Sequence, residues 1–275
     1  MIQEKRSALA SYLSRLLSKG QAVFSDTEAV QALGVSRGAF LDAAERLQRR
    51  HELLSPRRGF YVIVPPQFAS WGAPTPSWYI DALMQHENRP YYVGLLKAAE
   101  LHGATHQAVM EFQVVTDKRL PKIRAGRNLI VFYYRKDLAA VTSGMEARKT
   151  DTGSMKVSSP ELTALDLVRY PHAAGGMDNL ATVLADLGPK MEAQKLAALS
   201  ASAERSVVQR LGHLLGRLGH GERTGPLFEA LLGRGSIPWI ELDRKEASDP
   251  DFALPPQEKD QRWRVIVRRP PEIDQ

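Results

Sequence analysis

The chain has 275 residues, a net charge of +6 and no cysteine. Its length suggests two domains, and 43% hydrophobic with 25% charged residues is an ordinary globular composition. The lack of cysteine excludes disulfides, thiolate metal sites and enzymes with a cysteine nucleophile. No apolar run approaches the roughly 18 residues that a membrane span needs, and the N-terminus lacks the apolar core of a signal peptide, so we expect a cytoplasmic protein.

The first 66 residues predict a winged helix-turn-helix. Three helices are expected, over residues 7–19, 26–33 and 36–50. Gly34 can adopt the positive φ that ends the second helix, and Ser36 is a good N-cap for the third. The turn-prone segment Arg57–Gly59 then precedes the β-branched and aromatic run Phe60–Val64, which predicts a returning strand. Two short helices followed by a basic hairpin are an arrangement that places one helix in a DNA groove.

The third helix and the segments beside it carry the candidate DNA-binding residues. These residues are Lys19, Gln21, Ser36, Arg37, Gly38, Arg46, Arg49, Arg50, Arg57 and Arg58. Arg37 and Gly38 lie in the first turn, where helix-turn-helix proteins present side chains to base edges, whereas the later arginines suit phosphate contacts. Asp42 and Glu45 on the same helix would repel phosphate, and a solvated polar face is the alternative interpretation.

A proline-rich stretch from Pro65 to Pro76 indicates a boundary between a domain at 1–66 and a larger one at 67–275, with a further boundary near 172–177 as an alternative. In the larger domain we expect helices at 78–85, 91–101, 158–168, 179–187, 190–201, 206–218 and 226–232, strands at 111–115, 128–134, 237–242 and 263–267, and a loop at 248–260. The expected class is α+β, an N-terminal winged helix-turn-helix followed by a larger mixed α/β C-terminal domain.

Residues 112–156 form a second basic segment, with ten lysines and arginines against four acidic residues. Five of its cations fall between the two expected strands, namely Lys118, Arg119, Lys122, Arg124 and Arg127. A solvated hairpin loop is one interpretation of this cluster. We hypothesise instead that it is a second nucleic-acid patch, because clustered cations are the electrostatic signature of such surfaces.

Few residues point to catalysis. The chain has neither a glycine-rich phosphate loop nor a dinucleotide-binding fingerprint, and no Ser/His/Asp set can be assembled with any specificity. His102 and His106 have the i,i+4 spacing of a metal-binding helix, but Gly103 breaks the helix that would align them. We therefore expect no metal site and no cofactor.

Seven segments, taken together and in order, resemble the AbiEi antitoxins of type IV toxin–antitoxin systems. They are RRGFYVIVP at 57–65, YYVGLLKAAELHG at 91–103, EFQVVTDK at 111–118, VSSPELTALDLVRYP at 157–171, GGMDNLATVL at 175–184, RLGHLLGRLG at 210–219 and WRVIV at 263–267. They span most of the chain, which is more specific than any single motif. None of them is catalytic, so the resemblance implies a role and not a reaction.

What the resemblance implies is a transcriptional autorepressor and antitoxin that is not an enzyme. The winged helix would bind inverted repeats in double-stranded promoter DNA. The C-terminal domain would counter a nucleotidyltransferase-like toxin without forming a stable complex with it. The second basic patch would then meet either flanking DNA or the RNA target of the toxin.

Two alternatives belong to other functional classes. Glu111, Asp117 and Lys118 lie around an expected strand, and carboxylates followed by a lysine are compatible with a metal-dependent nuclease. The second alternative is a protein-interaction scaffold whose winged helix has lost DNA binding and docks a partner protein.

Overall fold

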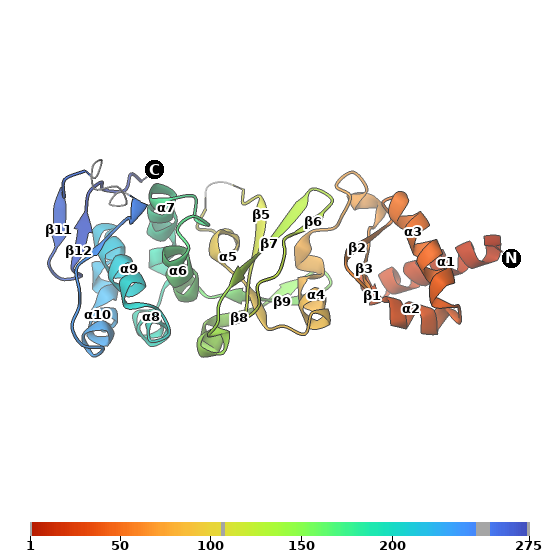
Figure 1. Ribbon diagram of the computed structural model, residues 1–275, viewed down its shortest axis with the longest axis horizontal. Coiled ribbons are helices and arrows are strands. Elements are labelled where there is room, and N and C mark those ends of the chain that lie inside the picture. The colour runs from red at the N-terminus through yellow and green to blue at the C-terminus, as the bar shows by residue number, and fades with distance from the viewer. Residues whose placement is uncertain (1, 106–107, 246–253, 274–275) are drawn as a thin grey trace. The chain divides into compact units, whose positions relative to one another are not determined.

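A computed structural model describes residues 2–105, 108–245 and 254–273 and shows helices combined with β-sheets (Figure 1). The expected mixture of α and β structure is therefore confirmed. The chain divides into two compact units. The first comprises Met1–Tyr92, Met110–Lys136 and Ala147–Lys156, and the second comprises Val93–Val109, Asp137–Glu146 and Val157–Gln275. Among the helices described, none has both the length and the apolar character needed to cross a membrane.

The first unit begins with three helices and three short strands. Their bounds are α1 Ile2–Ser18, β1 Val23–Ser25, α2 Asp26–Leu33, α3 Arg37–Arg49, β2 Leu53–Arg57 and β3 Phe60–Ile63. The strands form an antiparallel sheet in the order β1-β3-β2. The three helices lie where the sequence predicts them, whereas Arg57 ends strand β2 instead of belonging to the turn. Only Arg58 and Gly59 remain as the turn between β2 and β3.

Local side-chain chemistry sets the ends of α2 and α3. The Ser25 hydroxyl accepts a hydrogen bond from the backbone N–H of Glu28, and the Glu28 carboxylate accepts one from the Ser25 N–H, which makes a capping box at the start of α2. Gly34 ends α2 at φ 62°, and Ser36 caps α3 through the backbone N–H of Ala39. Both predicted signals are confirmed, and they fix the direction in which α3 leaves α2.

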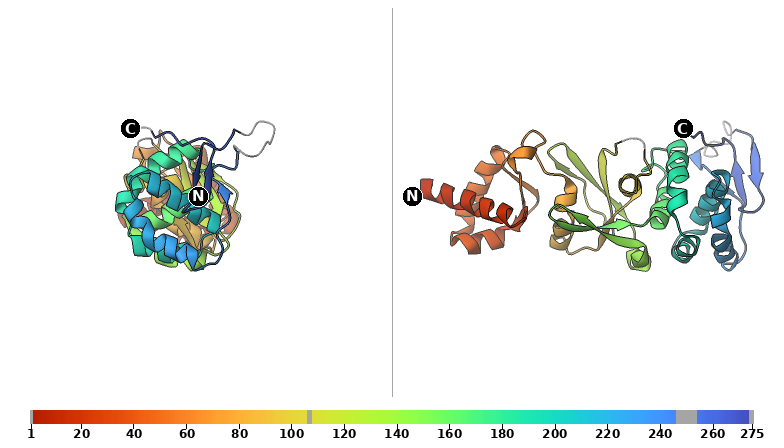
Figure 2. Two further views of the ribbon diagram at one scale, coloured as in Figure 1. Left: turned by 90° about the vertical axis from the view of Figure 1, so that its left-hand side faces the viewer. Right: turned by 180° about the vertical axis from the view of Figure 1, so that it is seen from behind.

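Aromatic rings form the centre of this three-helix part. Phe24 and Phe40 both contact the ring of Tyr61, with centroids 5.4 and 5.3 Å away, and all three side chains are buried. Leu9 and Tyr12 of α1 belong to the same cluster. In the rear view of Figure 2, α1 runs between α2 and α3. These aromatic side chains bury large apolar areas, so α3 is held on a rigid base.

A six-stranded sheet follows, most of it in the first unit. Its strands are β4 Tyr91–Val93, β5 Glu111–Thr116, β6 Ile123–Ala125, β7 Asn128–Tyr134, β8 Met145–Thr150 and β9 Gly153–Ser158, in the order β6-β7-β5-β4-β9-β8. Helix α4 (Ile80–His86) precedes β4. Strands β5 and β7 pair in parallel, from Glu111↔Leu129 to Thr116↔Tyr134, whereas β6 pairs with β7 in the antiparallel direction.

Two sequence predictions for this region are wrong. Tyr91–Val93 is a strand and not the start of a helix, because these β-forming side chains are fully buried within the sheet. The basic segment 118–127 is not a hairpin loop between β5 and β7, since those strands are parallel and the segment contains β6. Gly126 allows the tight turn from β6 into β7 at φ 56°, where an added Cβ would lie 2.2 Å from the Trp71 carbonyl oxygen. Strands β8 and β9 have no counterpart in the prediction.

The second unit is mainly helical. Its helices are α5 Leu95–Leu101, α6 Pro160–Arg169, α7 Met177–Leu187, α8 Ala193–Ser200, α9 Arg205–Arg217 and α10 Gly225–Leu232, and its small sheet consists of β10 Ile240–Glu241, β11 Glu258–Asp260 and β12 Val265–Val267. Helix α6 starts as predicted, with Ser159 as N-cap and Pro160 in the first turn. Helix α9 packs against β12, and the ring of Trp263 fills the space beside Gly212.

Short 3-10 helices connect several of these elements, at Pro66–Phe68, Pro76–Trp78, Leu138–Gly144, Gly188–Lys190 and Gly221–Thr224. The expected loop at 248–260 is only partly described, and its described end forms β11, which pairs with β12. The expected strand at 237–242 is shorter, and only Ile240–Glu241 pairs with β12. The apolar pattern therefore locates the strand but not its length.

Candidate nucleic-acid interface

Helix α3 presents most of the predicted DNA-binding residues to solvent. Arg37 and Gly38 are exposed in its first turn, and Arg49 and Arg50 are exposed at its other end, whereas Arg46 is half-buried. A rise of about 1.5 Å per residue puts these two ends roughly 18 Å apart. The helix can therefore offer one end to base edges and the other to phosphates. Lys19 and Gln21, which follow α1, are exposed as well.

An ion pair positions Arg37. One terminal nitrogen of its guanidinium, Nη2, donates to Oδ2 of Asp26 at 2.7 Å. The Asp26 side chain is 10% exposed, while that of Arg37 is 60% exposed. Burial, and then the negative charge of Asp26, raise the pKa of Tyr61 beneath them, and the charge of Arg37 opposes this rise. The pair holds one edge of the guanidinium and leaves its other edge accessible, as a base-reading arginine requires.

The two arginines of the predicted wing differ in their surroundings. Arg57 donates from Nε to the Glu87 carboxylate and from Nη2 to the Pro121 carbonyl oxygen, both at 2.8 Å, and its side chain is 19% exposed. It also lies over the ring of Phe132. Arg58 is exposed, and only its backbone carbonyl is bound, by His86. A phosphate contact by Arg57 therefore requires the loss of these partners, whereas Arg58 is already accessible.

The second basic patch lies on and around β6, close to the wing. Its five residues, Lys118, Arg119, Lys122, Arg124 and Arg127, are all exposed. Arg119 lies over the ring of Tyr134, at 5.3 Å from its centroid, and Arg127 lies over Trp71 at 5.5 Å. Because Arg57 binds the carbonyl of Pro121, the wing and this patch are neighbours within the first unit. The patch thus combines cations with exposed aromatic rings, a combination that suits single-stranded or duplex nucleic acid.

The geometry separates the residues of the proposed nuclease site. Glu111 begins β5 and Asp117 follows its last residue, so about 3.3 Å per residue puts them roughly 20 Å apart. Asp117 instead faces Arg89 at 3.8 Å. In the described parts of the chain, no group of three or more His, Asp or Glu side chains could hold a metal ion. Glu111 and Asp117 therefore cannot share one cation.

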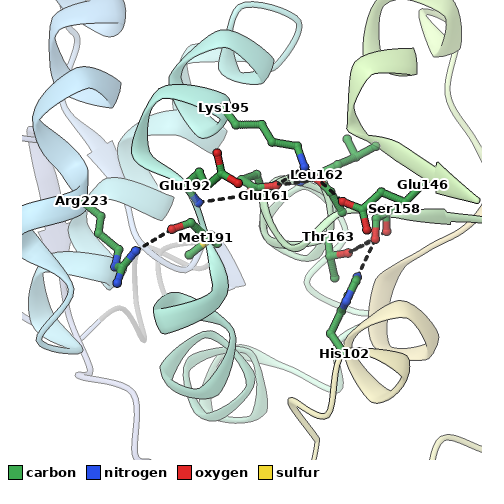
Figure 3. Close-up of polar contacts among 11 residues, drawn as sticks. His102, Glu146, Ser158, Glu161, Leu162, Thr163, Met191, Glu192, Lys195 and Arg223 are labelled. Atoms are coloured by element: carbon green, nitrogen blue, oxygen red, sulfur yellow. Dashed lines mark hydrogen bonds and ion pairs between the residues drawn. The ribbon is translucent and has the colours of Figure 1, made fainter.

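His102 has a structural partner. Its Nε2 lies 2.7 Å from the Ser158 carbonyl oxygen, which ties the end of α5 to the segment just before α6 (Figure 3). Lys190 binds the carbonyl oxygens of His102 and Gly103. His106, the second histidine of the predicted pair, lies outside the described residues.

The buried carboxylate of Glu161 lies at the start of α6 and connects it to neighbouring segments of the second unit (Figure 3). Its Oε2 accepts a hydrogen bond from the Ser159 hydroxyl at 2.6 Å, and its Oε1 accepts one from the Glu192 N–H at 2.8 Å. Lys195 on α8 lies 3.3 Å from Oε2 and also pairs with the more exposed Glu146. The sequence signal Ser-Ser-Pro-Glu located the helix start, but nothing in it identified Lys195 and Glu146 as partners.

The electrostatics of this cluster favour the charged forms. Burial alone would raise the pKa of the Glu161 carboxyl, but the hydrogen bonds from Ser159 and the Glu192 N–H and the charge of Lys195 outweigh it, so this pKa is lowered. Burial would likewise lower the pKa of the Lys195 ammonium, and the two carboxylates raise it instead. Both pKa shifts favour a negative Glu161 beside a positive Lys195. The cluster is therefore an ionic clamp between α6 and α8.

Comparisons with known proteins cover different shares of the chain. Residues 92–217 match the family described as the AbiEi antitoxin C-terminal domain. No curated protein matches the chain. Among solved structures, the RV2827C protein from Mycobacterium tuberculosis is similar, with a TM-score of 0.68 and 17% identity over 95% of this chain and 91% of that chain. At this identity the likeness shows a shared fold along nearly the whole chain. Residues 92–217, less than half of the chain, are thus similar to the AbiEi antitoxin C-terminal domain.

Proposed function

We propose that this protein is the antitoxin of a type IV toxin–antitoxin system and represses its own promoter. The family match over residues 92–217 is the observation that carries the antitoxin role. In this proposal the partner is a nucleotidyltransferase-like toxin, opposed without a stable complex. Residues 67–275 would supply the antitoxin function, with a further boundary near 172–177 as the alternative.

We assign DNA binding to residues 1–66 as a winged helix-turn-helix. Three helices with a three-stranded antiparallel sheet in the order β1-β3-β2 support this assignment, because β2 and β3 form the hairpin that a wing requires. The capped and exposed first turn of α3 supports base reading by Arg37 beside Gly38. Lys19, Gln21, Arg49, Arg50 and Arg58 would bind phosphates. Arg46 and Arg57 would join them after local rearrangement, and Ser36 keeps α3 capped.

The second basic patch extends this surface. Lys122 follows the residue that Arg57 binds, so DNA bound by the wing would continue past β6. We propose that the patch contacts the flanking backbone of the operator. Contact with the RNA target of the toxin is the other use that its charge and its aromatic neighbours support.

An electrophoretic mobility shift assay with the promoter fragment tests the DNA-binding role. Arg37→Ala should cost about 1–3 kcal/mol of binding free energy and relax specificity at one base position. Arg58→Gln should weaken binding to all sequences and lower the slope of affinity against salt by about one unit. Arg205→Gln, which removes an exposed arginine of the second unit, is the control and should leave the shift unchanged.

Failure of the wild-type chain to bind its promoter at low salt would remove the DNA-binding role. If a partner protein co-purified with the chain and the arginine substitutions changed nothing, the protein-interaction scaffold would replace it. Cleavage of DNA or RNA in the presence of Mg²⁺ or Mn²⁺, abolished by Glu111→Gln, would instead establish the nuclease.

A further inference from the structure

A buried arginine on α9 has no carboxylate partner among the described residues. Arg210 is 8% exposed, and its Nε donates to the backbone carbonyls of Glu241 and Leu242, at 3.0 and 2.9 Å. No described Asp or Glu lies within ion-pair distance of it, and its two terminal nitrogens have no hydrogen-bond partner in the described structure. Burial of a charge without a counter-ion is unfavourable by several kcal/mol. The arginine therefore needs an explanation other than stability.

A second guanidinium increases this imbalance. Burial lowers the pKa of Arg210, the positive charge of Arg244 lowers it further, and Asp243 opposes the shift. Arg244 is exposed, and its charge is close enough to Arg210 to repel it. Two guanidinium groups that repel each other beside one carboxylate form a site whose energy falls when an anion enters.

Both arginines line a cavity of about 510 Å³ in the second unit. Its wall also contains Arg169, which is neutralised by Glu204 at 2.7 Å and therefore adds little positive charge. Tyr170, Met177 and Val207 add aromatic and apolar surface to its lining. Its size lies in the range of about 300–1,000 Å³ that small organic ligands occupy. A cavity lined by both cations and an aromatic ring suits an anion that carries an organic group.

We propose that this cavity binds a small phosphorylated ligand of nucleotide size. The phosphate lies on the terminal nitrogens of Arg210 and on Arg244, because the guanidinium fork matches the spacing of phosphate oxygens. The organic part lies against Tyr170 and Met177. The two carbonyls that accept from Nε fix the orientation of Arg210, so its free edge faces the cavity before the ligand arrives.

Isothermal titration calorimetry on the full chain tests this proposal. The titrants are the four ribonucleoside 5′-monophosphates, adenosine and inorganic phosphate. At least one monophosphate should bind with a Kd below about 1 mM, inorganic phosphate should bind more weakly, and adenosine should give no heat. Arg244→Gln should weaken nucleotide binding about tenfold or more, through the loss of a charge-assisted pair.

Two further variants make the test specific. Arg210→Lys keeps the charge but loses the fork, so binding should fall, and its thermal unfolding reports whether the fold is kept. Arg205→Gln lies on the same helix outside the cavity and should bind as the wild type does. The proposal is overturned if no monophosphate binds, or if Arg244→Gln, an exposed position that should not disturb the fold, binds like the wild type. Equal affinity for inorganic phosphate and the nucleotides would overturn the nucleotide assignment.

Discussion

The ionic clamp offers a prediction with a matched control. Glu161 and Glu146 both pair with Lys195, but the Glu161 side chain is 2% exposed and that of Glu146 is 49% exposed. Glu161→Gln keeps the shape and removes the charge, and its amide group must place donors against the Lys195 ammonium or the Glu192 N–H. Loss of one charged partner from a buried set costs about 2–4 kcal/mol of unfolding free energy. Glu146→Gln should change it by less than about 1 kcal/mol.

Thermal unfolding followed by circular dichroism measures this difference. For a chain of this size, a loss of about 3 kcal/mol lowers Tm by roughly 6–12 °C. Because the pKa of Glu161 is lowered in the folded state, its stabilisation is complete above the unfolded-state pKa of about 4.3 and is lost as the pH falls through the folded pKa. The gap between wild type and Glu161→Gln should therefore be full at neutral pH and should narrow below about pH 4. Equal losses for the two substitutions at neutral pH would refute the clamp.

Three other experiments probe separate features. Gly38→Ala should raise the unfolding free energy by about 0.5–1 kcal/mol in urea unfolding, since nothing lies within 4 Å of the added Cβ. In the mobility shift assay it should weaken promoter binding if DNA must approach the backbone of α3 closely at this position. A double-mutant cycle on Arg57→Gln and Glu87→Gln should give a coupling energy of about 1–3 kcal/mol in urea unfolding. A coupling energy of zero would show that this half-buried ion pair does not stabilise the fold. Gly212→Ala should destabilise the second unit by more than about 2 kcal/mol, because the new Cβ would lie 2.3 Å from the Trp263 ring; wild-type stability in urea would contradict the packing described.

Helix ends that depend on only a few neighbouring residues can be predicted from the sequence. Gly34 and Ser36 determine where α2 ends and α3 begins through their own backbone angle and hydroxyl, so no distant partner was needed. The same is true of Ser159 and Pro160 at the start of α6. Strands can be predicted where the local pattern favours a strand, as at β5 and β7, but not where the local pattern favours a helix. Tyr91–Val93 looks helical beside the leucines and alanines that follow, and only its place in the sheet makes it a strand.

In the candidate interface, too, some features can be predicted from local sequence and others depend on distant residues. The exposure of Arg37, Arg49 and Arg58 follows from their positions on a helix or in a turn, which the sequence indicated. The state of Arg57 depends on Glu87 and Pro121, which are 30 and 64 residues away in the chain. A pattern of neighbouring residues cannot indicate contacts between residues so far apart in the chain. The spacing that predicts a helix at 206–218 likewise does not reveal that Arg210 lines a cavity.

A growth-rescue assay tests the proposed antitoxin role directly. The nucleotidyltransferase-like protein proposed as the toxin is expressed together with the full-length wild-type chain or with a chain carrying both Arg37→Ala and Arg58→Gln. The toxin alone should arrest growth and both chains should restore it, although only the wild type should shift the promoter fragment. Continued arrest in the presence of a well-expressed wild-type chain would contradict the antitoxin role.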